Sequence, residues 1–227
     1  MILRVVGLSK KYGGVSALEG VSLELREGEV VGMIGPNGSG KTTLLDLICG
    51  FIKPDLGRIY LNGMDVTDWK PFKIASLGVA RTFQITKVFK KMTVIENMLA
   101  ARRDPDKAYR LLRLVELDGL RDEYAENLSG GQQKLLEFVR SLMLEPRLLL
   151  MDEPMAGVTP VIMERLVELI KDVNRRGVTF LIVEHNISVV ARLCERCLVL
   201  NNGRLIAEGN LEAIRNHPEV KKAYLGE

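Results

Sequence analysis

Gly35-Pro36-Asn37-Gly38-Ser39-Gly40-Lys41-Thr42 has the spacing G-x-x-x-x-G-K-[ST], which is typical of a phosphate-binding loop. The apolar run 30–34 before it predicts a buried strand, and residues 43–49 after it predict a helix. Glycine lets the main chain come close to a ligand, and successive N–H groups of such a loop form a nest for an anion. The helix start adds the positive end of its dipole. The stretch therefore predicts a site for nucleotide phosphates, and a glycine-rich turn without a ligand is the alternative.

The loop also supplies side chains for a nucleotide. We expect Lys41 to reach the outer phosphates as a cation, and the Thr42 hydroxyl to be a hard oxygen ligand suited to Mg²⁺. Thr43 follows directly and is included in the expected nucleotide-binding set.

The composition is that of a globular protein with little charge imbalance. Of 227 residues, 47% are apolar. The chain has 32 basic and 29 acidic residues, which gives a net charge of +3. This balance gives no reason to expect nucleic acid as the main partner. The apolar runs are too short to span a bilayer, and the N-terminus has no secretory pattern. We expect one domain, residues 1–227, that stays in the cytosol.

The pattern of apolar residues predicts alternating strands and helices. Strands are expected at 3–8, 21–25, 58–61, 79–83, 148–151 and 178–183, with a closing hairpin at 199–206. Helices are expected from a capping box at 93–96 through 101, at 108–117, within 128–144, at 159–177 and as one short helix in 211–227, with an exposed loop at 85–92. Parallel strands joined by helices place ligands at the carboxyl ends of the strands.

Polar side chains follow three of these strands. Asp152 and Glu153 come after the apolar run 148–151; we expect Asp152 to hold Mg²⁺, directly or through water, and Glu153 to orient or deprotonate an attacking water. An acidic pair at a helix N-terminus is the alternative. Gln84 and His185 end two other predicted strands, where they would contribute a Mg²⁺ or water contact and a γ-phosphate donor. A lone His is more often a structural residue.

The role of Tyr12 has two interpretations, and so has the role of the cysteine pair near the end of the chain. Tyr12 precedes the phosphate loop at a strand end, where an aromatic ring either stacks on a nucleotide base or covers a sheet edge. Cys194 and Cys197 form a C-x-x-C, which is a redox or metal pair in some proteins. No second cysteine pair or His cluster completes a zinc site, so two half-buried thiols where a helix meets a strand is the favoured interpretation.

Leu128-Ser129-Gly130-Gly131-Gln132 decides the class of protein. Ser129 to Gln132 fits a capping box, so a well-capped helix without a ligand is one interpretation. However, this five-residue motif precedes the strand with the acidic pair. The phosphate loop, Gln84, this motif, the acidic pair and His185 follow one another along the chain in the order typical of the ABC ATPases. Nearly the full chain therefore resembles that family.

The resemblance implies an α/β fold of the P-loop NTPase class, with a mixed central sheet, an antiparallel β subdomain and a helical signature subdomain. Residues 1–84 and 144–227 would form the catalytic lobe, and residues 85–143 the helical lobe. In this family two copies meet head to tail around two ATP molecules with Mg²⁺. Ser129, Gly130, Gly131 and Gln132 of one copy would complete the site of the other, which suits an anion site at a helix start.

A finer resemblance is to the ATP-binding subunits of branched-chain amino acid importers. It is carried by the stretches 81–85, 94–97, 153–158 and 223–227. It implies an ATPase at the cytoplasmic face of the membrane that powers separate transmembrane permease subunits. A periplasmic or extracellular substrate-binding protein would take part indirectly, and the second ATPase subunit is either a copy or a paralogue.

Three alternatives remain from the sequence. Related transporters of urea or lipopolysaccharide share parts of these stretches. A non-transport ABC ATPase acting on nucleic acid usually has insertions or basic extensions that this chain lacks, and a regulatory nucleotide-binding module without turnover does not need Glu153.

Two parts of the chain are expected to contact other subunits, one the second ATPase subunit and the other the permease. Many family members have Asp where this chain has Thr159, which suits a helix N-cap but makes no charged contact with a partner subunit. Residues 85–97, with Val88 and Phe89, are the expected contact with the permease.

Overall fold

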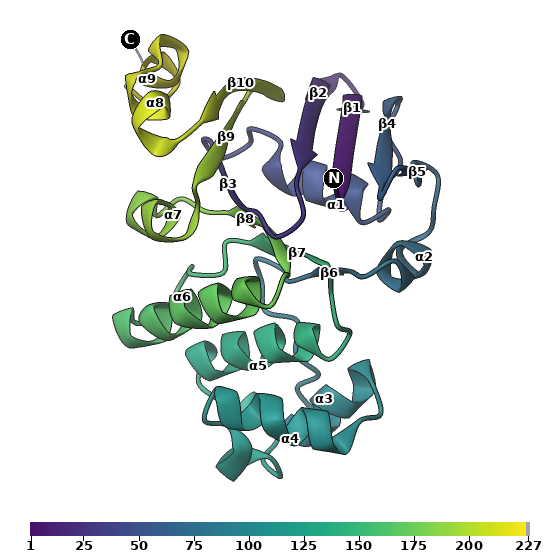
Figure 1. Cartoon of the computed structure of the whole chain (residues 1–227), viewed down its shortest axis with the longest axis vertical. Coiled ribbons are helices and arrows are strands. Elements are labelled where there is room, and N and C mark those ends of the chain that lie inside the picture. The colour runs from purple at the N-terminus through teal and green to yellow at the C-terminus, as the bar shows by residue number, and fades with distance from the viewer. Residues whose placement is uncertain (226–227) are drawn as a thin grey trace.

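The computed structural model describes residues 1–225 and contains two sheets (Figure 1). The larger sheet has the strand order β10-β9-β3-β8-β7-β6. It is mixed, because β10 pairs antiparallel with β9 while β9, β3, β8, β7 and β6 run parallel. The smaller sheet is antiparallel with the order β2-β1-β4-β5. The expected α/β class with a mixed central sheet and an antiparallel subdomain is confirmed.

The strands are β1 (Leu3–Tyr12), β2 (Val15–Leu25), β3 (Val30–Ile34), β4 (Leu56–Leu61), β5 (Met64–Asp65), β6 (Val79–Arg81), β7 (Leu148–Asp152), β8 (Thr179–Val183), β9 (Arg196–Asn201) and β10 (Arg204–Gly209). The helices are α1 (Lys41–Ile48), α2 (Pro71–Ser76), α3 (Val94–Ala101), α4 (Pro105–Leu114), α5 (Gly130–Leu142), α6 (Pro160–Arg175), α7 (Ile187–Leu193), α8 (Leu211–Asn216) and α9 (Pro218–Leu225), with 3₁₀ turns η1 (Asp118–Leu120) and η2 (Ala125–Asn127).

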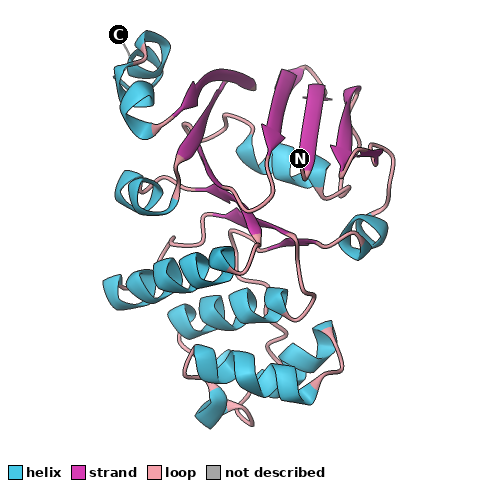
Figure 2. Ribbon diagram, viewed as in Figure 1, coloured by secondary structure: helices cyan, strands magenta, loops and turns pink. Residues whose placement is uncertain are grey.

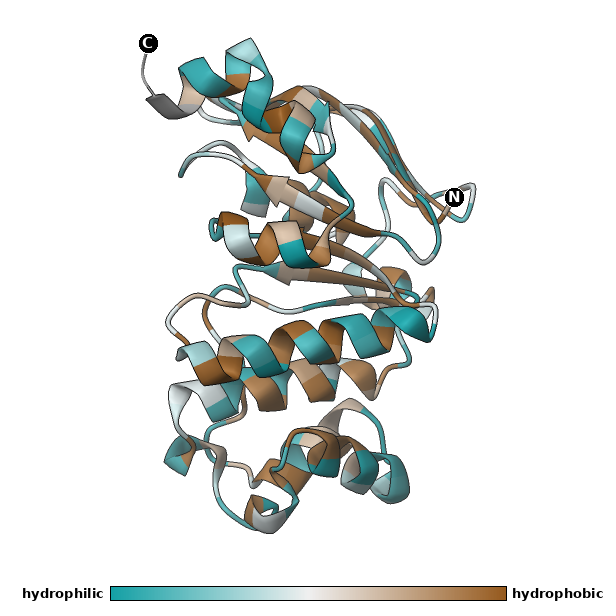
Figure 3. Ribbon diagram, turned by 60° about the vertical axis from the view of Figure 1, so that its left-hand side comes forward, coloured by the Kyte–Doolittle hydropathy of each residue, from teal (hydrophilic) through white to brown (hydrophobic). Residues whose placement is uncertain are grey.

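The central strands β7 and β8 are buried at every position. Continuous apolar runs of this kind are expected where helices or a second sheet cover both faces of a parallel sheet. Leu149 and Met151 belong to the hydrophobic core on the side of α5 and α6, whereas Leu148 and Leu150 belong to the core on the side of α1 and the antiparallel sheet. The sheet therefore separates two cores, and apolar residues run along its strands in Figure 3.

The helices divide between the two ends of the molecule. In Figure 1, α3, α4 and α5 lie at one end, α6 lies between α5 and the sheet, and the antiparallel sheet and α9 lie at the other end; Figure 2 shows the same grouping of helices and strands. Both predicted capping boxes are present, at Thr93 for α3 and at Ser129 for α5. They fix where these two helices begin, and α5 begins within the Leu128–Gln132 motif.

Several boundaries differ from the sequence expectations. The helix expected at 108–117 is α4, which starts at Pro105 because Asp104 caps it through the Lys107 N–H at 3.0 Å. It ends before Glu116, whose φ of +60° is not helical. The strand expected at 79–83 stops at Arg81. The antiparallel strands β1 and β2 are longer than expected.

Three elements were not expected, and the tail differs. The helices α2 and α7 and the strand β5 were not predicted from the sequence. The end of the chain holds two helices, α8 and α9, rather than one short helix. Residues 226–227 of the stretch 223–227 lie outside the described residues.

The cysteines are structural. Cys194 lies at the end of α7 and Cys197 on β9, which confirms the expected position where a helix meets a strand, but both thiols are buried rather than half-buried. Burial raises the pKa of the Cys197 thiol to about 11. Within residues 1–225 no group of His, Cys, Asp and Glu has the arrangement of a metal site made by such side chains alone. None of the helices in that range is long and apolar enough to cross a membrane.

Candidate nucleotide-binding and hydrolysis site

A cleft of about 520 Å³, here called the Lys41 cleft, lies over the glycine loop. Its walls come from β2, from the loop and the start of α1, and from the carboxyl ends of the central strands. The lining residues are Val15, Ser16, Ala17, Asn37, Gly38, Ser39, Gly40, Lys41, Thr42, Thr43, Gln84, Glu153 and His185. The structure therefore brings the predicted phosphate loop together with three side chains from distant parts of the chain.

The glycine loop is shaped by close main-chain approaches. Gly40 has a φ of +104°, and a Cβ atom there would lie 2.4 Å from the Ala17 carbonyl oxygen. A Cβ atom at Gly35 would lie 2.0 Å from the Leu200 carbonyl oxygen. Any larger residue at either position would displace the loop from β2 or β9. These two glycines are needed to fit the loop between its neighbours.

Lys41 lies buried inside its own loop. Its Nζ atom donates to the carbonyl oxygens of Gly35 at 2.8 Å and Pro36 at 2.9 Å, and to Ser39 Oγ at 3.4 Å. Burial lowers the pKa of Lys41, and the nearby carboxylates of Glu153 and Asp152 oppose this shift. The ammonium is held by neutral oxygens at the base of the cleft, where a phosphate group would offer stronger, charged acceptors.

Glu153 is the meeting point of the predicted catalytic side chains. Gln84 Nε2 donates to its Oε2 at 3.0 Å, and His185 Nε2 lies 2.9 Å from its Oε1. The three residues follow β6, β7 and β8, neighbouring parallel strands whose carboxyl ends share one edge of the sheet. The backbone of Glu153 has a φ of +49°, uncommon for a residue with a side chain, and its N–H donates to Val183. The predicted convergence is therefore present in the structure.

Asp152 lies beneath this group and is 1% exposed. Burial raises its pKa, while the Arg81 guanidinium and the Thr42 hydroxyl oppose the shift. Arg81 Nη2 donates to Oδ2 at 3.2 Å, and Oδ1 is buried with no hydrogen-bond partner. Asp152 Oδ1 and the Thr42 hydroxyl are hard oxygen ligands of the kind that Mg²⁺ prefers. A buried carboxylate oxygen without a hydrogen-bond partner is uncommon, and a bound metal ion would account for it. The residues present therefore fit a Mg²⁺ ion bound together with nucleotide.

Arg81 is a site residue that the sequence analysis did not identify. Its buried guanidinium donates to Asp152 and also to Asp46 on α1, and it lies 5.0 Å from the centre of the Phe83 ring. It connects β6, β7 and α1 directly under the cleft. An arginine at the end of an apolar strand is the only signal in the sequence, and it gives no partner.

Glu184 holds the segment after Glu153 in place. Its buried carboxylate accepts hydrogen bonds from the Met155 N–H at 2.8 Å and from the N–H groups of His185 at 3.0 Å and Asn186 at 3.2 Å. Thr159 caps α6 by accepting from the Ile162 N–H at 3.5 Å, which confirms its expected capping role. These contacts link the segment that follows the acidic pair to the strand that ends at His185.

Tyr12 and residues 129–132 lie outside the cleft lining, as do Gly35, Pro36 and the buried Asp152. Tyr12 is exposed at the end of β1, with the Lys10 ammonium 5.8 Å from its ring centre. Ser129 accepts from the Gln132 N–H at 3.3 Å, and Gln132 accepts from the Ser129 N–H at 2.9 Å; Gly130 and Gly131 open α5 beside them. Ser129 and Gly130 are exposed. Within one chain, the helix start at Ser129 is thus a surface feature separate from the Lys41 cleft.

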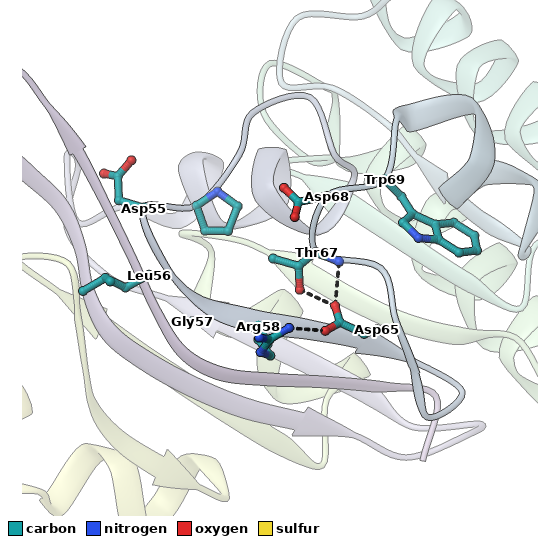
Figure 4. Close-up of a pocket in the computed structure, with 9 residues that line it drawn as sticks. Asp55, Leu56, Gly57, Arg58, Asp65, Thr67, Asp68 and Trp69 are labelled. Atoms are coloured by element: carbon teal, nitrogen blue, oxygen red, sulfur yellow. Dashed lines mark hydrogen bonds and ion pairs between the residues drawn. The ribbon is translucent and has the colours of Figure 1, made fainter.

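A second hollow, of about 600 Å³, lies along β4 and β5 in the antiparallel sheet (Figure 4). Three of its polar side chains pair with one another: Asp65 accepts from the Thr67 hydroxyl at 2.6 Å and from Arg58 at 2.7 Å. These contacts lower the pKa of Asp65 to about 2. None of the predicted site residues lines this hollow.

Family models match most of the chain. Residues 18–156 match the model described as "ABC transporter", and residues 204–227 match "Branched-chain amino acid ATP-binding cassette transporter". The first range includes the glycine loop, Gln84, the Leu128–Gln132 motif and the acidic pair. The second range covers β10 and the helices that follow it.

Two similar proteins match this chain over at least 95% of their own length. The probable branched-chain amino acid transport ATP-binding protein LivG of Archaeoglobus fulgidus is 42% identical, with 99% of this chain and 95% of that protein covered. The high-affinity LivG of Escherichia coli is 37% identical, with coverage of 100% and 98%.

Solved structures agree as well. The crystal structure of a nucleotide-free ATP-binding cassette from an ABC transporter has a TM-score of 0.92 at 37% identity, covering 100% of this chain and 99% of that one. The ADP conformation of an ATP-binding cassette of an ABC transporter has a TM-score of 0.89 at 37% identity, with the same coverage. The resemblances found in the sequence are thereby confirmed, and the chain belongs to the ABC transporter family as one of its ATP-hydrolysing, nucleotide-binding subunits.

Proposed function

We propose that this chain is the ATPase subunit of an importer of branched-chain or other hydrophobic amino acids. The match of residues 204–227 and the names of the relatives support this cargo class. The observation that carries the hydrolytic role is the carboxylate of Glu153, held between Gln84 and His185 at the edge of the Lys41 cleft. This is where a water attacking the terminal phosphate would need a base.

The site residues divide the work as follows. Lys41 exchanges its carbonyl partners for the outer phosphates, and the N–H groups of Gly35 and residues 37–43 bind the phosphate chain, with Thr43 at the start of α1. Thr42, Asp152 Oδ1 and the Gln84 amide oxygen would hold Mg²⁺, which neutralises charge on the phosphates when bound. Tyr12, at the end of β1, is proposed to stack on the base.

Glu153 needs a free oxygen to act as the base. In this structure both of its carboxylate oxygens have partners, Gln84 and His185. When His185 turns to the γ-phosphate as a donor, Oε1 becomes free to accept a proton from water, while Gln84 orients that water. The arrangement seen here is therefore a resting one.

The second half of the site comes from another subunit. We propose that residues 85–143 act as a helical lobe beside a catalytic lobe of residues 1–84 and 144–227. Ser129, Gly130, Gly131 and Gln132, at the exposed start of α5, then bind the γ-phosphate held by a facing copy or paralogue. Thr159 caps α6 but brings no charge to that interface.

Attachment to the membrane is proposed to occur through permease subunits, at the cytoplasmic face. The segment 85–97 presents Ile85, 75% exposed, and Phe89, 51% exposed, next to Gln84. Exposed apolar side chains of this kind suit a protein partner. The substrate-binding protein would act on the outer side of that permease, without touching this chain.

Two measurements test the function together. Purified protein should release phosphate from MgATP, and cells that lack this subunit should regain leucine uptake, but not urea uptake, when it is supplied with its permease. Absence of any ATP turnover, or restored urea uptake alone, would contradict the respective part of the proposal.

A further inference from the structure

Three charged side chains form a row along one face of α5. Lys134, Glu137 and Arg140 are spaced three residues apart, so each lies about one helical turn from the next and is its neighbour on the helix surface. All three face the segment 82–92, here called the Gln84 loop, which has no helix or strand of its own. Most of their polar contacts are with main-chain atoms of that loop, so the contacts do not depend on which side chains it carries.

Lys134 joins this row to the catalytic group. Its Nζ atom donates to the carbonyl oxygen of Gln84 at 3.3 Å and to that of Glu153 at 3.2 Å. One ammonium thus holds the backbones of two residues whose side chains also meet each other. Because Glu153 has a positive φ, its backbone needs such external support to keep that conformation.

Glu137 and Arg140 hold the rest of the loop. Glu137 is 4% exposed, and its Oε1 accepts from the Lys87 N–H at 2.9 Å. Arg140 donates to the Lys87 carbonyl oxygen and to Asn97 Oδ1 at 3.3 Å, and its guanidinium lies 5.0 Å from the centre of the Phe89 ring. Both main-chain groups of Lys87 are therefore bound by α5.

We propose that Lys134, Glu137 and Arg140 act as a clasp that positions Gln84 and Glu153 for hydrolysis. The clasp seats the Gln84 loop on α5, so a shift of α5, whose N-cap is Ser129, moves Gln84 and the Glu153 backbone with it. Lys134 is the central positioning residue, since it alone of the three contacts both. The catalytic consequence rests on the proposed function, whereas the hold on the loop does not.

A simpler interpretation is that the row only stabilises the packing of α5 against the loop. The two interpretations differ in what a variant changes. Loss of packing lowers the melting temperature and affects every property of the protein. Loss of positioning lowers kcat, because a small displacement of a catalytic group is costly, but leaves the KM for ATP unchanged, because the glycine loop is untouched.

The test uses Lys134→Met, which keeps the length of the side chain and removes its three donors. Amide hydrogen exchange in peptides covering residues 83–89 should become about ten-fold faster, the scale of one hydrogen bond to a charged group. The kcat for MgATP should fall about 10- to 100-fold at constant KM. Lys134→Arg, which keeps donors, should restore most of both. Lys221→Met, an exposed lysine on α9, should match the wild type.

The outcomes separate the two proposals. Unchanged exchange in 83–89 would overturn the clasp. Faster exchange with an unchanged kcat, or a kcat loss that Lys134→Arg does not reverse, would overturn the positioning role. If the wild-type protein has no ATPase activity but Lys134→Met still speeds exchange, the proposed function fails and the hold on the Gln84 loop is supported.

Discussion

His185 Nε2 lies 2.9 Å from Glu153 Oε1, although the two residues follow different strands and are 32 positions apart. Gln84, which follows a third strand, donates to the other carboxylate oxygen. The carboxylate that we propose as the base therefore has a partner on each oxygen. Under that proposal, activation requires one of these contacts to be exchanged for a contact with phosphate, which links the start of hydrolysis to nucleotide binding.

Replacing the base removes proton acceptance while keeping the shape of the side chain. Glu153→Gln should lower kcat about 100- to 10,000-fold, because an amide does not accept the proton of the attacking water. ATP binding should remain, and size-exclusion chromatography should show a dimer that persists with ATP. Phosphate release within a few-fold of the wild type would remove Glu153 from the role of base.

His185→Ala should slow hydrolysis without abolishing nucleotide binding. The variant leaves Glu153 Oε1 without its His185 partner and removes the proposed donor to the γ-phosphate, so kcat should fall about 100-fold or more. The Kd for a fluorescent ADP analogue should stay near that of the wild type, because ADP has no γ-phosphate. A matching loss of ADP affinity would show that His185 instead supports the fold of the cleft.

Arg81→Met should destabilise the subunit. The substitution leaves the buried carboxylate of Asp152 without its guanidinium partner, and removing one member of a buried ion pair costs about 3–5 kcal/mol. Urea unfolding in the presence of EDTA measures this loss. Arg147→Met is the control, since Arg147 pairs with Glu27 at the surface and should change stability by about 1 kcal/mol or less. Equal losses in the two variants would contradict the assignment of Arg81.

The thiols should be unreactive in the folded protein. Burial raises the pKa of Cys49 to about 12 and that of Cys197 to about 11, so neither is a thiolate at pH 8. Because these folded values lie above the ordinary thiol pKa of about 9, the thiols should not affect stability below pH 9. Above pH 9 ionisation in the unfolded chain lowers stability. Labelling with iodoacetamide at pH 8 without denaturant would disprove this.

The sequence predicts best what depends on local pattern. The continuous apolar runs of β7 and β8, the capping boxes at Thr93 and Ser129, and the turn at Asn202 are each encoded within a few residues, and the structure has them. The meeting of Gln84, Glu153 and His185 could be predicted because parallel strands share one edge of the sheet.

Long-range pairing explains what the sequence analysis missed. The partners of Arg81 lie 35 and 71 positions away, and the contacts of Lys134 and Arg140 reach back as far as 53 positions, so no local pattern identifies them. The helices α2 and α7 have six and seven residues, too few to show a clear period. The boundary of α4 is set by one capping aspartate and one proline, which outweigh the apolar pattern.

The claim on which the account depends is that the Lys41 cleft of one subunit is completed by Ser129 of another. Lys41→Ala and Ser129→Arg should each be inactive alone. When the two variants are mixed, half of the randomly formed dimers carry one intact site, so ATPase activity should return to about one quarter of the wild-type value. Phosphate release from the mixture that stays at the level of the separate variants would contradict a site shared between subunits.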